Sequence, residues 1–141
     1  MTEAAARPAP GTDVVTDRRP LSILLAEDNL VNRRLVAAVL GDLGHRVEAV
    51  ADGAAAVAAA AQGGFDLILM DIEMPGIDGL EATRRIRAHG GAAGRTPIIA
   101  LTANAEPGDR ARVRAAGMND HVAKPIDLAA LAQAIERART P

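Results

Sequence analysis

Short apolar runs alternate with longer amphipathic segments along most of the chain. Five runs have the length and composition of buried strands, and they lie near residues 21–26, 46–50, 66–70, 97–101 and 120–123. Between them, apolar residues recur three and four positions apart, which is the spacing of a helix face packed on a sheet. Because helical crossovers join parallel strands, the alternation predicts a doubly wound α/β domain with a parallel sheet buried on both faces.

Capping residues indicate where several helices begin and end. Asp52 and Asp127 each precede a helical segment, and Asp78 with Glu81 three residues later resembles a capping box. The first helix should end at Gly44. Its wide apolar stripe, which we expect to cover one sheet face, consists of Val31, Leu35, Val36, Val39, Leu40 and Leu43. The last helix has a shorter apolar face made of Leu128, Leu131 and Ile135.

The fourth helical segment differs from the others. Between Pro107 and Gly117, Val113 is its only large apolar residue, so the helix can bury little area. We therefore expect it to be the least firmly held element, as would suit a switch.

Composition narrows the function. The 141 residues suffice for one domain, expected at 21–139, and the polar, Ala- and Pro-rich residues 1–20 are expected to be a flexible tail or linker. A net charge of −2 with 1% aromatic residues argues against nucleic-acid binding. The absence of cysteine excludes thiolate metal sites. With no apolar stretch of membrane-spanning length and no signal peptide, we expect a cytoplasmic protein that binds no membrane.

Polar groups follow four of the five expected strands. Glu27 and Asp28 follow the first, Asp71 the third, Thr102 the fourth and Lys124 the fifth. Ligands of doubly wound sheets bind beyond the carboxyl ends of the strands, where these groups should converge. Three carboxylates in one cleft repel each other unless a cation lies among them, and an all-oxygen ligand set favours Mg²⁺, with Mn²⁺ as a substitute.

Lys124 is the only lysine in a chain that otherwise uses arginine. A lysine ammonium is a compact point charge, whereas an arginine is a planar fork, so the exception indicates a site that requires a point charge. Such a charge could contact a phosphoryl oxygen beside the carboxylates.

In these features the chain resembles the receiver domains of two-component response regulators. The resemblance extends from Leu21 to Arg139 and is carried by four segments in order: Leu24–Asn29, Leu69–Gly79, Ala100–Ala103 and Ala123–Pro125. It implies a flavodoxin-like (βα)5 fold with a parallel sheet of order 2-1-3-4-5. It also implies a cis peptide bond before Pro125.

The resemblance also assigns roles. It implies Asp71 as the phosphoacceptor, contacted by Lys124, and Thr102 and His121 as the switch pair. The metal ligands would be Glu27, Asp28, Asp71 and the backbone carbonyl of Glu73. A sensor histidine kinase or histidine phosphotransfer protein would donate the phosphoryl group.

The implied output is a change in the surface of the fourth helix, fifth strand and fifth helix, read by an unidentified protein partner. Slow autodephosphorylation would reset it, with Glu73 and Asn104 near the attacking water. No small-molecule turnover is expected. The runs Glu27–Arg33 and Asp120–Ile126 are similar to receivers that work with hybrid sensor kinases.

Three alternatives remain open from the sequence. A haloacid-dehalogenase-like phosphatase also uses a strand-end Asp with Mg²⁺, but it needs a second Asp where Glu73 stands. A flavodoxin-like nucleotide binder needs a phosphate-binding loop where Glu27 and Asp28 would repel phosphate. A receiver-like interaction module that is never phosphorylated would need no complete site, whereas every signature position is present here.

Overall fold

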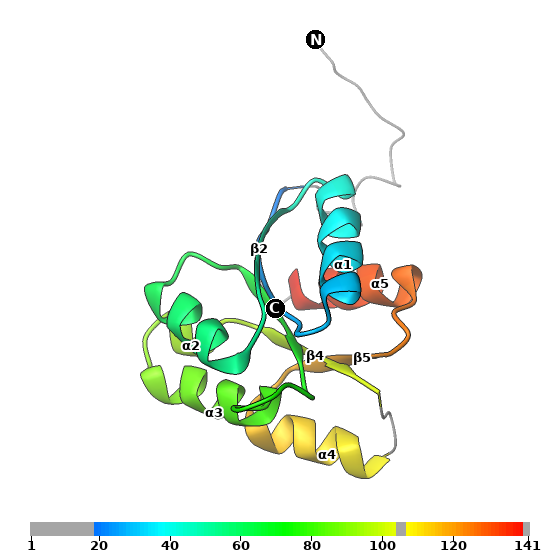
Figure 1. Cartoon of the computed structure of the whole chain (residues 1–141). Coiled ribbons are helices and arrows are strands. Elements are labelled where there is room, and N and C mark those ends of the chain that lie inside the picture. The colour runs from blue at the N-terminus through cyan, green and yellow to red at the C-terminus, as the bar shows by residue number, and fades with distance from the viewer. Residues whose placement is uncertain (1–18, 104–106, 140–141) are drawn as a thin grey trace.

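A computed structural model describes residues 19–103 and 107–139, and the strands in this part of the chain form one parallel sheet. Its order is β2-β1-β3-β4-β5, as predicted (Figure 1). The strands are β1 (Ser22–Ala26), β2 (Arg46–Val50), β3 (Leu67–Asp71), β4 (Ile98–Thr102) and β5 (Asp120–Ala123). Their starts lie within one residue of the expected ones, and β3 and β4 extend one residue further, so that Asp71 and Thr102 belong to the strands themselves.

Helices alternate with the strands as the apolar spacing predicted. They are α1 (Leu30–Asp42), α2 (Gly53–Gln62), α3 (Gly79–His89), the 3-10 helix η2 (Ala93–Arg95), α4 (Pro107–Ala116) and α5 (Leu128–Arg139). Asp52 caps α2 by accepting a hydrogen bond from Ala55 N at 2.7 Å. Asp78 caps α3 in the same way, by accepting a hydrogen bond from Glu81 N at 2.8 Å. The second hydrogen bond of the expected capping box, from Asp78 N to the Glu81 carboxylate, is not formed, because this carboxylate pairs with two arginines on the next turn.

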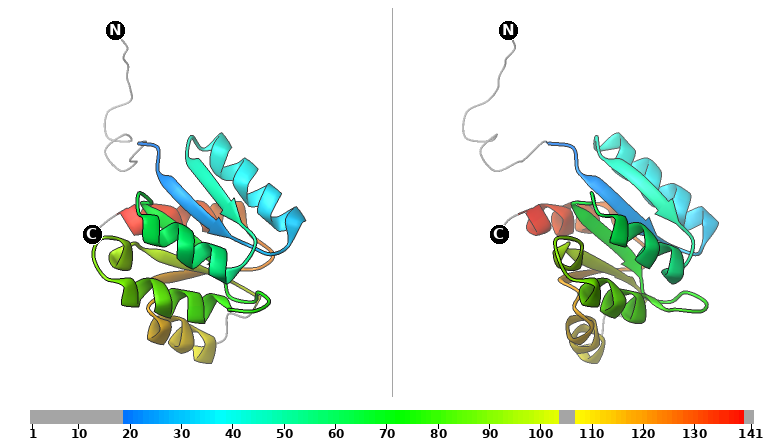
Figure 2. Two further views of the ribbon diagram at one scale, coloured as in Figure 1. Left: turned by 60° about the vertical axis from the view of Figure 1, so that its left-hand side comes forward. Right: turned by 90° about the vertical axis from the view of Figure 1, so that its left-hand side faces the viewer.

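The helices form two layers around the sheet (Figure 2). One core packs α1 and α5 on the sheet, and the other packs α2, α3 and α4 on the opposite face. Residues of β1, β3 and β4 alternate between the two cores, so that neighbours such as Ile68 and Leu69 are both fully buried. Each fully buried Leu or Ile side chain contributes roughly 1.5–3 kcal/mol to folding, which makes these central strands the rigid platform of the site.

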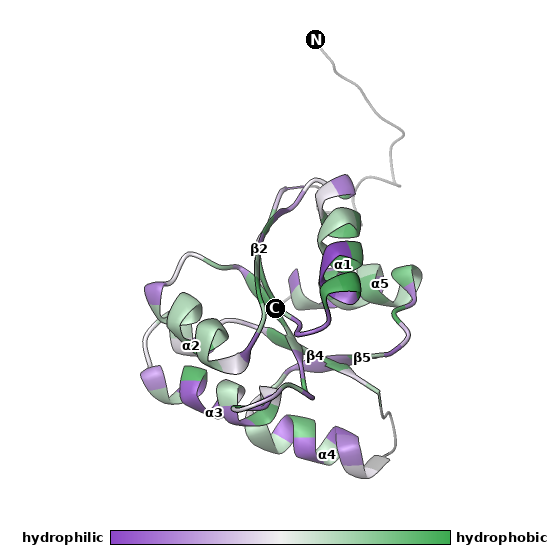
Figure 3. Cartoon of the chain, viewed as in Figure 1, coloured by the Kyte–Doolittle hydropathy of each residue, from purple (hydrophilic) through white to green (hydrophobic). Residues whose placement is uncertain are grey.

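The apolar stripe of α1 is wider than the face that α1 buries. Val36 and Leu40 are buried against the sheet, whereas Val31 and Leu35 are 73% and 50% exposed. The expectation that the whole stripe covers the sheet was therefore wrong, because a helix lying on a sheet hides only one side of its cylinder. Figure 3 shows hydrophobic stretches on α1 beside hydrophilic ones. Leu128 at the start of α5 is similarly exposed, while Leu131 and Ile135 are buried.

Two sequence expectations concern residues outside the described part. The flexible tail was expected at 1–20, of which the structure describes only 19 and 20, and Asn104 is also outside the described ranges. In the described residues, no helix is both long enough and apolar enough to cross a membrane.

Candidate functional site

Three carboxylates meet at the carboxyl edge of the sheet. Glu27 directly follows β1, Asp28 comes next, and Asp71 ends β3. One carboxylate oxygen from each of the three lies within 4.8 Å of the others. Glu27 and Asp71 are almost completely buried, whereas Asp28 is exposed. The predicted convergence is therefore present, with two carboxylates in the floor of the site and one at its mouth.

The loop after β3 is held close to the strand end. Gly79, the first residue of α3, donates a hydrogen bond from its N to Ile72 O at 2.8 Å. A Cβ at Gly79 would overlap the carbonyl oxygen of Asp71 and the Cα of Ile72. Only glycine allows α3 to begin this close to Asp71, which explains its place in the sequence.

Arg33 supports the acidic turn between β1 and α1. Its Nη1 donates to the carbonyl oxygens of Glu27 at 2.8 Å and Asp28 at 3.4 Å, and Asn29 N donates to Glu27 Oε2 at 3.1 Å. Sequence reasoning missed this role. The sequence did contain a signal for it. Arg33 lies one turn inside a helix that begins just after two acidic residues, and from there an arginine can reach back to their backbone carbonyl groups.

Lys124 forms an ion pair with each of the two buried carboxylates. Its Nζ lies 3.0 Å from Glu27 Oε1 and 3.1 Å from Asp71 Oδ1. The chain reaches this position from β5, where Lys124 N donates to Thr102 O at 2.7 Å and a cis peptide bond joins Lys124 to Pro125. Burial alone would lower the pKa of Lys124, but hydrogen bonds and the charges of the two carboxylates outweigh burial, and the pKa is raised.

Asp71 has an unusual environment for a carboxyl group. Burial, together with the adjacent Glu27 carboxylate, raises the pKa of Asp71 to about 7 despite the opposing effect of Lys124. Its Oδ1 accepts a hydrogen bond from Glu73 N at 3.1 Å. Its Oδ2 is buried and has no hydrogen-bond partner among the described residues. A buried acceptor without a donor, beside two further carboxylates, fits a hard divalent cation as its missing partner.

Thr102 and His121 lie on neighbouring strands. Thr102 is buried at the end of β4 and pairs in register with Ala123 of β5. His121 is two residues earlier on β5, so its side chain points to the same face of the sheet as that of Ala123. His121 is half-buried. The two side chains expected to form the switch are therefore arranged diagonally across adjacent strands, one near the carboxylates and one further from them.

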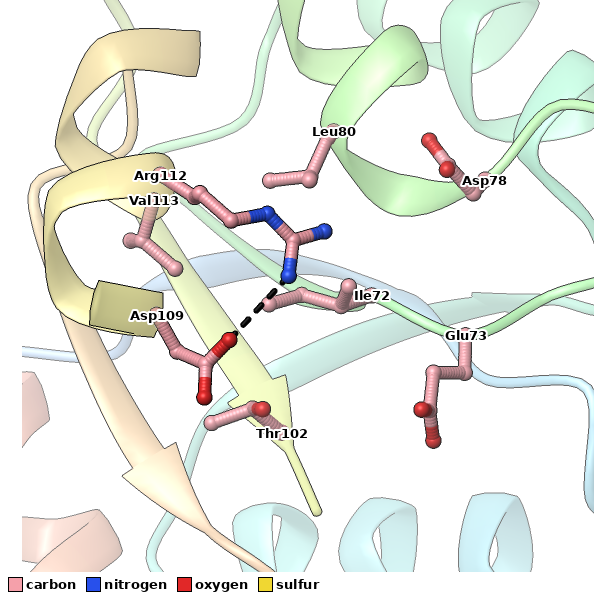
Figure 4. Close-up of a pocket in the computed structure, with 8 residues that line it drawn as sticks. All are labelled: Ile72, Glu73, Asp78, Leu80, Thr102, Asp109, Arg112 and Val113. Atoms are coloured by element: carbon pink, nitrogen blue, oxygen red, sulfur yellow. Dashed lines mark hydrogen bonds and ion pairs between the residues drawn. The ribbon is translucent and has the colours of Figure 1, made fainter. Parts of the chain in front are cut away.

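A small pocket of about 140 Å³ opens next to the end of β3 (Figure 4). It lies between α4 and the loop after β3, and this loop supplies Ile72 and Glu73 to its lining. Arg112 points across the pocket and pairs with Asp109 at 3.1 Å, with Thr102 below them. The sequence did not single out this ion pair. The pair places the charged face of α4 on the lining of the same pocket as Thr102 and Glu73.

The chain is similar to known proteins in sequence and fold. The sequence model of the response regulator receiver domain family matches residues 23–136. The sensor protein GacS of Pseudomonas syringae pv. syringae is 44% identical over 115 residues, which are 80% of this chain but 13% of GacS. The chain thus spans only a small part of this curated relative.

Solved structures agree with the sequence match. The receiver domain of the sensor histidine kinase PA1611 from Pseudomonas aeruginosa, solved with a magnesium ion in its active site cleft, is 50% identical, with a TM-score of 0.77. The match covers 84% of this chain and 97% of that one. The receiver domain of Ssk1 from Saccharomyces cerevisiae, solved with the histidine phosphotransfer protein Ypd1, is 29% identical, with a TM-score of 0.76 over 82% of this chain and 86% of that chain.

The family match decides against the phosphatase and the nucleotide binder, because it covers the sheet, the three carboxylates and Lys124 together. A receiver that is never phosphorylated would belong to the same family, and labelling with a phosphodonor distinguishes it. The hybrid signal transduction histidine kinase G of Dictyostelium discoideum is 40% identical over 125 residues, which are 87% of this chain but 4% of that protein. This match agrees with the subtype expected from the sequence. The chain belongs to the response regulator receiver family, and it is a receiver domain of the two-component phosphorelay type.

Proposed function

We propose that Asp71 is the residue that accepts the phosphoryl group, and that a phosphohistidine of a sensor histidine kinase or a histidine phosphotransfer protein donates it. The observation that supports this assignment is Asp71 Oδ2, a buried carboxylate oxygen without a hydrogen-bond partner among the described residues. Asp71 is also the only one of the three clustered carboxylates that belongs to a strand of the central sheet.

The proposed step transfers one phosphoryl group. A carboxylate oxygen of Asp71 forms a bond to phosphorus, the phosphorus–nitrogen bond of the donor breaks, and the imidazole nitrogen keeps the electron pair and is reprotonated. Lys124, already 3.1 Å from Asp71 Oδ1, stays beside the new acyl phosphate and pairs with its oxygens. Attack by water would later release inorganic phosphate and restore the carboxylate.

The proposed metal is Mg²⁺, with Mn²⁺ as a substitute. Glu27, Asp28 and Asp71 would hold it, together with the backbone carbonyl of Glu73. When bound, the ion supplies positive charge that offsets the repulsion between the carboxylates and an incoming phosphoryl group. The magnesium in the PA1611 receiver domain supports this choice.

Output would pass through Thr102 and His121. An acyl phosphate carries roughly −1.5 to −2 charges in place of one, which would draw the Thr102 hydroxyl toward it. The diagonal arrangement of the two side chains would let His121 turn toward the vacated space. This would change the surface formed by α4, β5 and α5, for which we propose a protein partner.

The exposed apolar side of α1 is the proposed docking surface for the phosphoryl donor. Leu30, Val31 and Leu35 are 49–73% exposed, and Leu128 adds an apolar side chain at the start of α5. Asp28 and the acidic turn lie directly before α1, so a helical partner on this surface would bring its histidine next to the site. The Ssk1 receiver domain was solved with the histidine phosphotransfer protein Ypd1, which supports a phosphotransfer protein as the donor.

The experiment that tests the proposal combines a small phosphodonor with two controls. Incubation with phosphoramidate and Mg²⁺ should add one phosphoryl mass to the intact chain, whereas chelation of Mg²⁺ should abolish the addition. Asp71→Asn should remain unmodified, because its amide cannot act as the nucleophile. Equal labelling of Asp71→Asn would assign the acceptor to another residue.

A further inference from the structure

Two pockets share a wall on the side of the molecule formed by α4, β5 and α5. The wider one has a volume of about 490 Å³, and its lining includes Pro97, Ile99, Arg114, Asp120, Arg137 and Ala138. The narrower one has a volume of about 120 Å³, and its lining includes Arg110, Val113, Arg114, Asp120 and His121. Because Arg114 and Asp120 line both pockets, we treat them as one groove beside the edge strand β5 and call it the β5 groove.

Positive charge dominates the β5 groove. Arg110 and Arg114 are four residues apart and therefore lie on the same face of α4. Neither has an ion pair or a side-chain hydrogen bond with any residue in the described ranges. On the opposite wall, Arg137 donates from Nε to Asp120 Oδ2 at 2.8 Å. Its two Nη groups have no partner in the same ranges, so the groove presents three guanidinium groups against one carboxylate.

We propose that the β5 groove binds an acidic segment of a partner protein. Carboxylates about one helical turn apart would pair with Arg110 and Arg114, whose Cβ atoms are roughly 5–6 Å apart. A further carboxylate would reach the Nη groups of Arg137. Pro97 and Ile99 line the wider pocket and offer space for one apolar side chain between the charges.

Two other occupants fit the groove less well. A second copy placed symmetrically on the same face would need free acidic residues of that face to pair with Arg110 and Arg114. The nearby acidic residues are already paired, Asp109 with Arg112 and Asp120 with Arg137. Nucleic acid needs aromatic side chains for stacking or a longer basic track, but the chain has a single Phe and no Trp or Tyr.

The groove is also connected to the proposed switch. His121 lines the narrower pocket together with Arg110 and Arg114. If phosphorylation turns His121 inward, the narrower pocket changes shape, and the affinity for the acidic segment changes with it. This state dependence rests on the proposed function, whereas the recognition of carboxylates by the arginines does not.

The test uses a defined probe. A capped peptide of three Glu-Ala-Leu-Glu repeats presents glutamates three and four positions apart, and the same peptide with Gln for Glu is its uncharged match. Titration into the ¹⁵N-labelled chain should shift amide signals of α4, β5 and α5 with the Glu peptide only. Binding should weaken as salt is added, because exposed ion pairs are screened.

Matched variants locate the contact. R110Q with R114Q should lower the affinity for the Glu peptide by about fivefold or more, since two of the three available cations are removed. R46Q makes the same charge change on β2, at the opposite edge of the sheet, and should bind like the unmodified chain. Equal binding by the double variant, or shifts confined to α1, would overturn the proposal.

The remaining outcomes are equally decisive. If a single-stranded oligonucleotide binds through the same arginines more tightly than the Glu peptide, the groove is a nucleic-acid site instead. If the chain dimerises and R110Q with R114Q dissociates it, the occupant is a second copy. Peptide binding that persists in Asp71→Asn supports the groove even if phosphorylation fails, so the two proposals are judged separately.

Discussion

Asp71 is buried beside a second carboxylate, and this environment couples its ionisation to folding and to metal binding. Its pKa is raised from the ordinary value of 3.8 to about 7 by burial and by Glu27. Because the folded pKa exceeds the unfolded one, the contribution of this carboxyl to stability is complete below about pH 4 and is lost as the pH rises to about 7. Divalent metal requires the charged form, so Mg²⁺ and protons compete for the site.

We therefore expect opposite pH trends with and without metal. Metal-free protein should lose stability between pH 5 and pH 7.5, and Mg²⁺ should raise the Tm more at pH 7.5 than at pH 5. At tenfold excess over its Kd, the ion should add about 1.4 kcal/mol, or roughly 5 °C. Thermal unfolding followed by circular dichroism measures both trends.

Asp71→Asn is the control for this titration. It removes the shifted carboxyl, so its metal-free Tm should vary less over the same pH interval, and its Mg²⁺ response should shrink. If Mg²⁺ shifted the Tm equally at both pH values, the ionisation of Asp71 would not govern metal binding.

The sequence predicted the meeting of Glu27, Asp28, Asp71 and Lys124 because parallel strands bring their carboxyl ends to one edge. It did not predict the contact of Arg33 with the preceding turn. A side chain that reaches back from a helix depends on turn geometry and rotamer, which residue spacing alone does not define.

At the scale of elements, the start of α3 depends on a missing side chain. We expect Gly79→Ala to destabilise the protein by about 1–3 kcal/mol, because the new Cβ meets the backbone of Asp71 and Ile72, which cannot move without disturbing β3. It should also slow phosphorylation, since Asp71 would be displaced. Urea unfolding and labelling with phosphoramidate measure the two effects.

Gly41→Ala serves as the matched substitution. Gly41 lies in the last turn of α1, and a Cβ there meets nothing within 4 Å. This variant should be more stable than the unmodified chain by about 0.5–1 kcal/mol, as alanine replaces glycine in a helix. A similar loss in both variants would mean that the approach of α3 to β3 is not restrictive.

Arg87 ties α3 to the turn between α4 and β5. It donates to Gly117 O at 2.9 Å, to Thr96 O at 2.6 Å and to Asn119 Oδ1 at 2.8 Å, among other acceptors. We expect Arg87→Met to lower the free energy of unfolding by about 2–4 kcal/mol, because several partly buried acceptors lose their donor together.

Arg84→Met is the comparison for Arg87. Arg84 is exposed and pairs only with Glu81 among the described residues, so its loss should change stability by less than about 0.5 kcal/mol. Urea unfolding of both variants gives the difference. Equal stabilities would show that the Arg87 bonds add nothing to the fold.

Elements were predicted more accurately than the surfaces they bury. Strand limits followed from apolar runs, and the caps at Asp52 and Asp78 followed from side-chain chemistry. The exposure of half of the α1 stripe could not be predicted, because periodicity identifies apolar positions without showing which of them face a sheet. Val31 and Leu35 illustrate the difference, since both are apolar yet 73% and 50% exposed.

At the scale of the whole molecule, the proposed signal crosses from the carboxylate site to the side formed by α4, β5 and α5. On phosphorylation, hydrogen exchange of residues 107–126 should change more than that of residues 46–63, because Thr102 and His121 connect the site to the former region. Exchange followed by mass spectrometry before and after phosphoramidate treatment measures this. A uniform change over both regions would contradict a directed switch.

The central claim is that Asp71 carries the phosphoryl group, and chemical trapping tests it most directly. Borohydride reduces an aspartyl phosphate to homoserine, which peptide mass spectrometry identifies by position. After treatment with phosphoramidate and Mg²⁺, we expect homoserine at position 71 and none when Mg²⁺ is chelated. We expect no homoserine at Asp28 and no 5-hydroxynorvaline, the corresponding product of a glutamyl phosphate, at Glu27 under any condition. Homoserine at another position, or full conversion at position 71 without metal, would contradict the account.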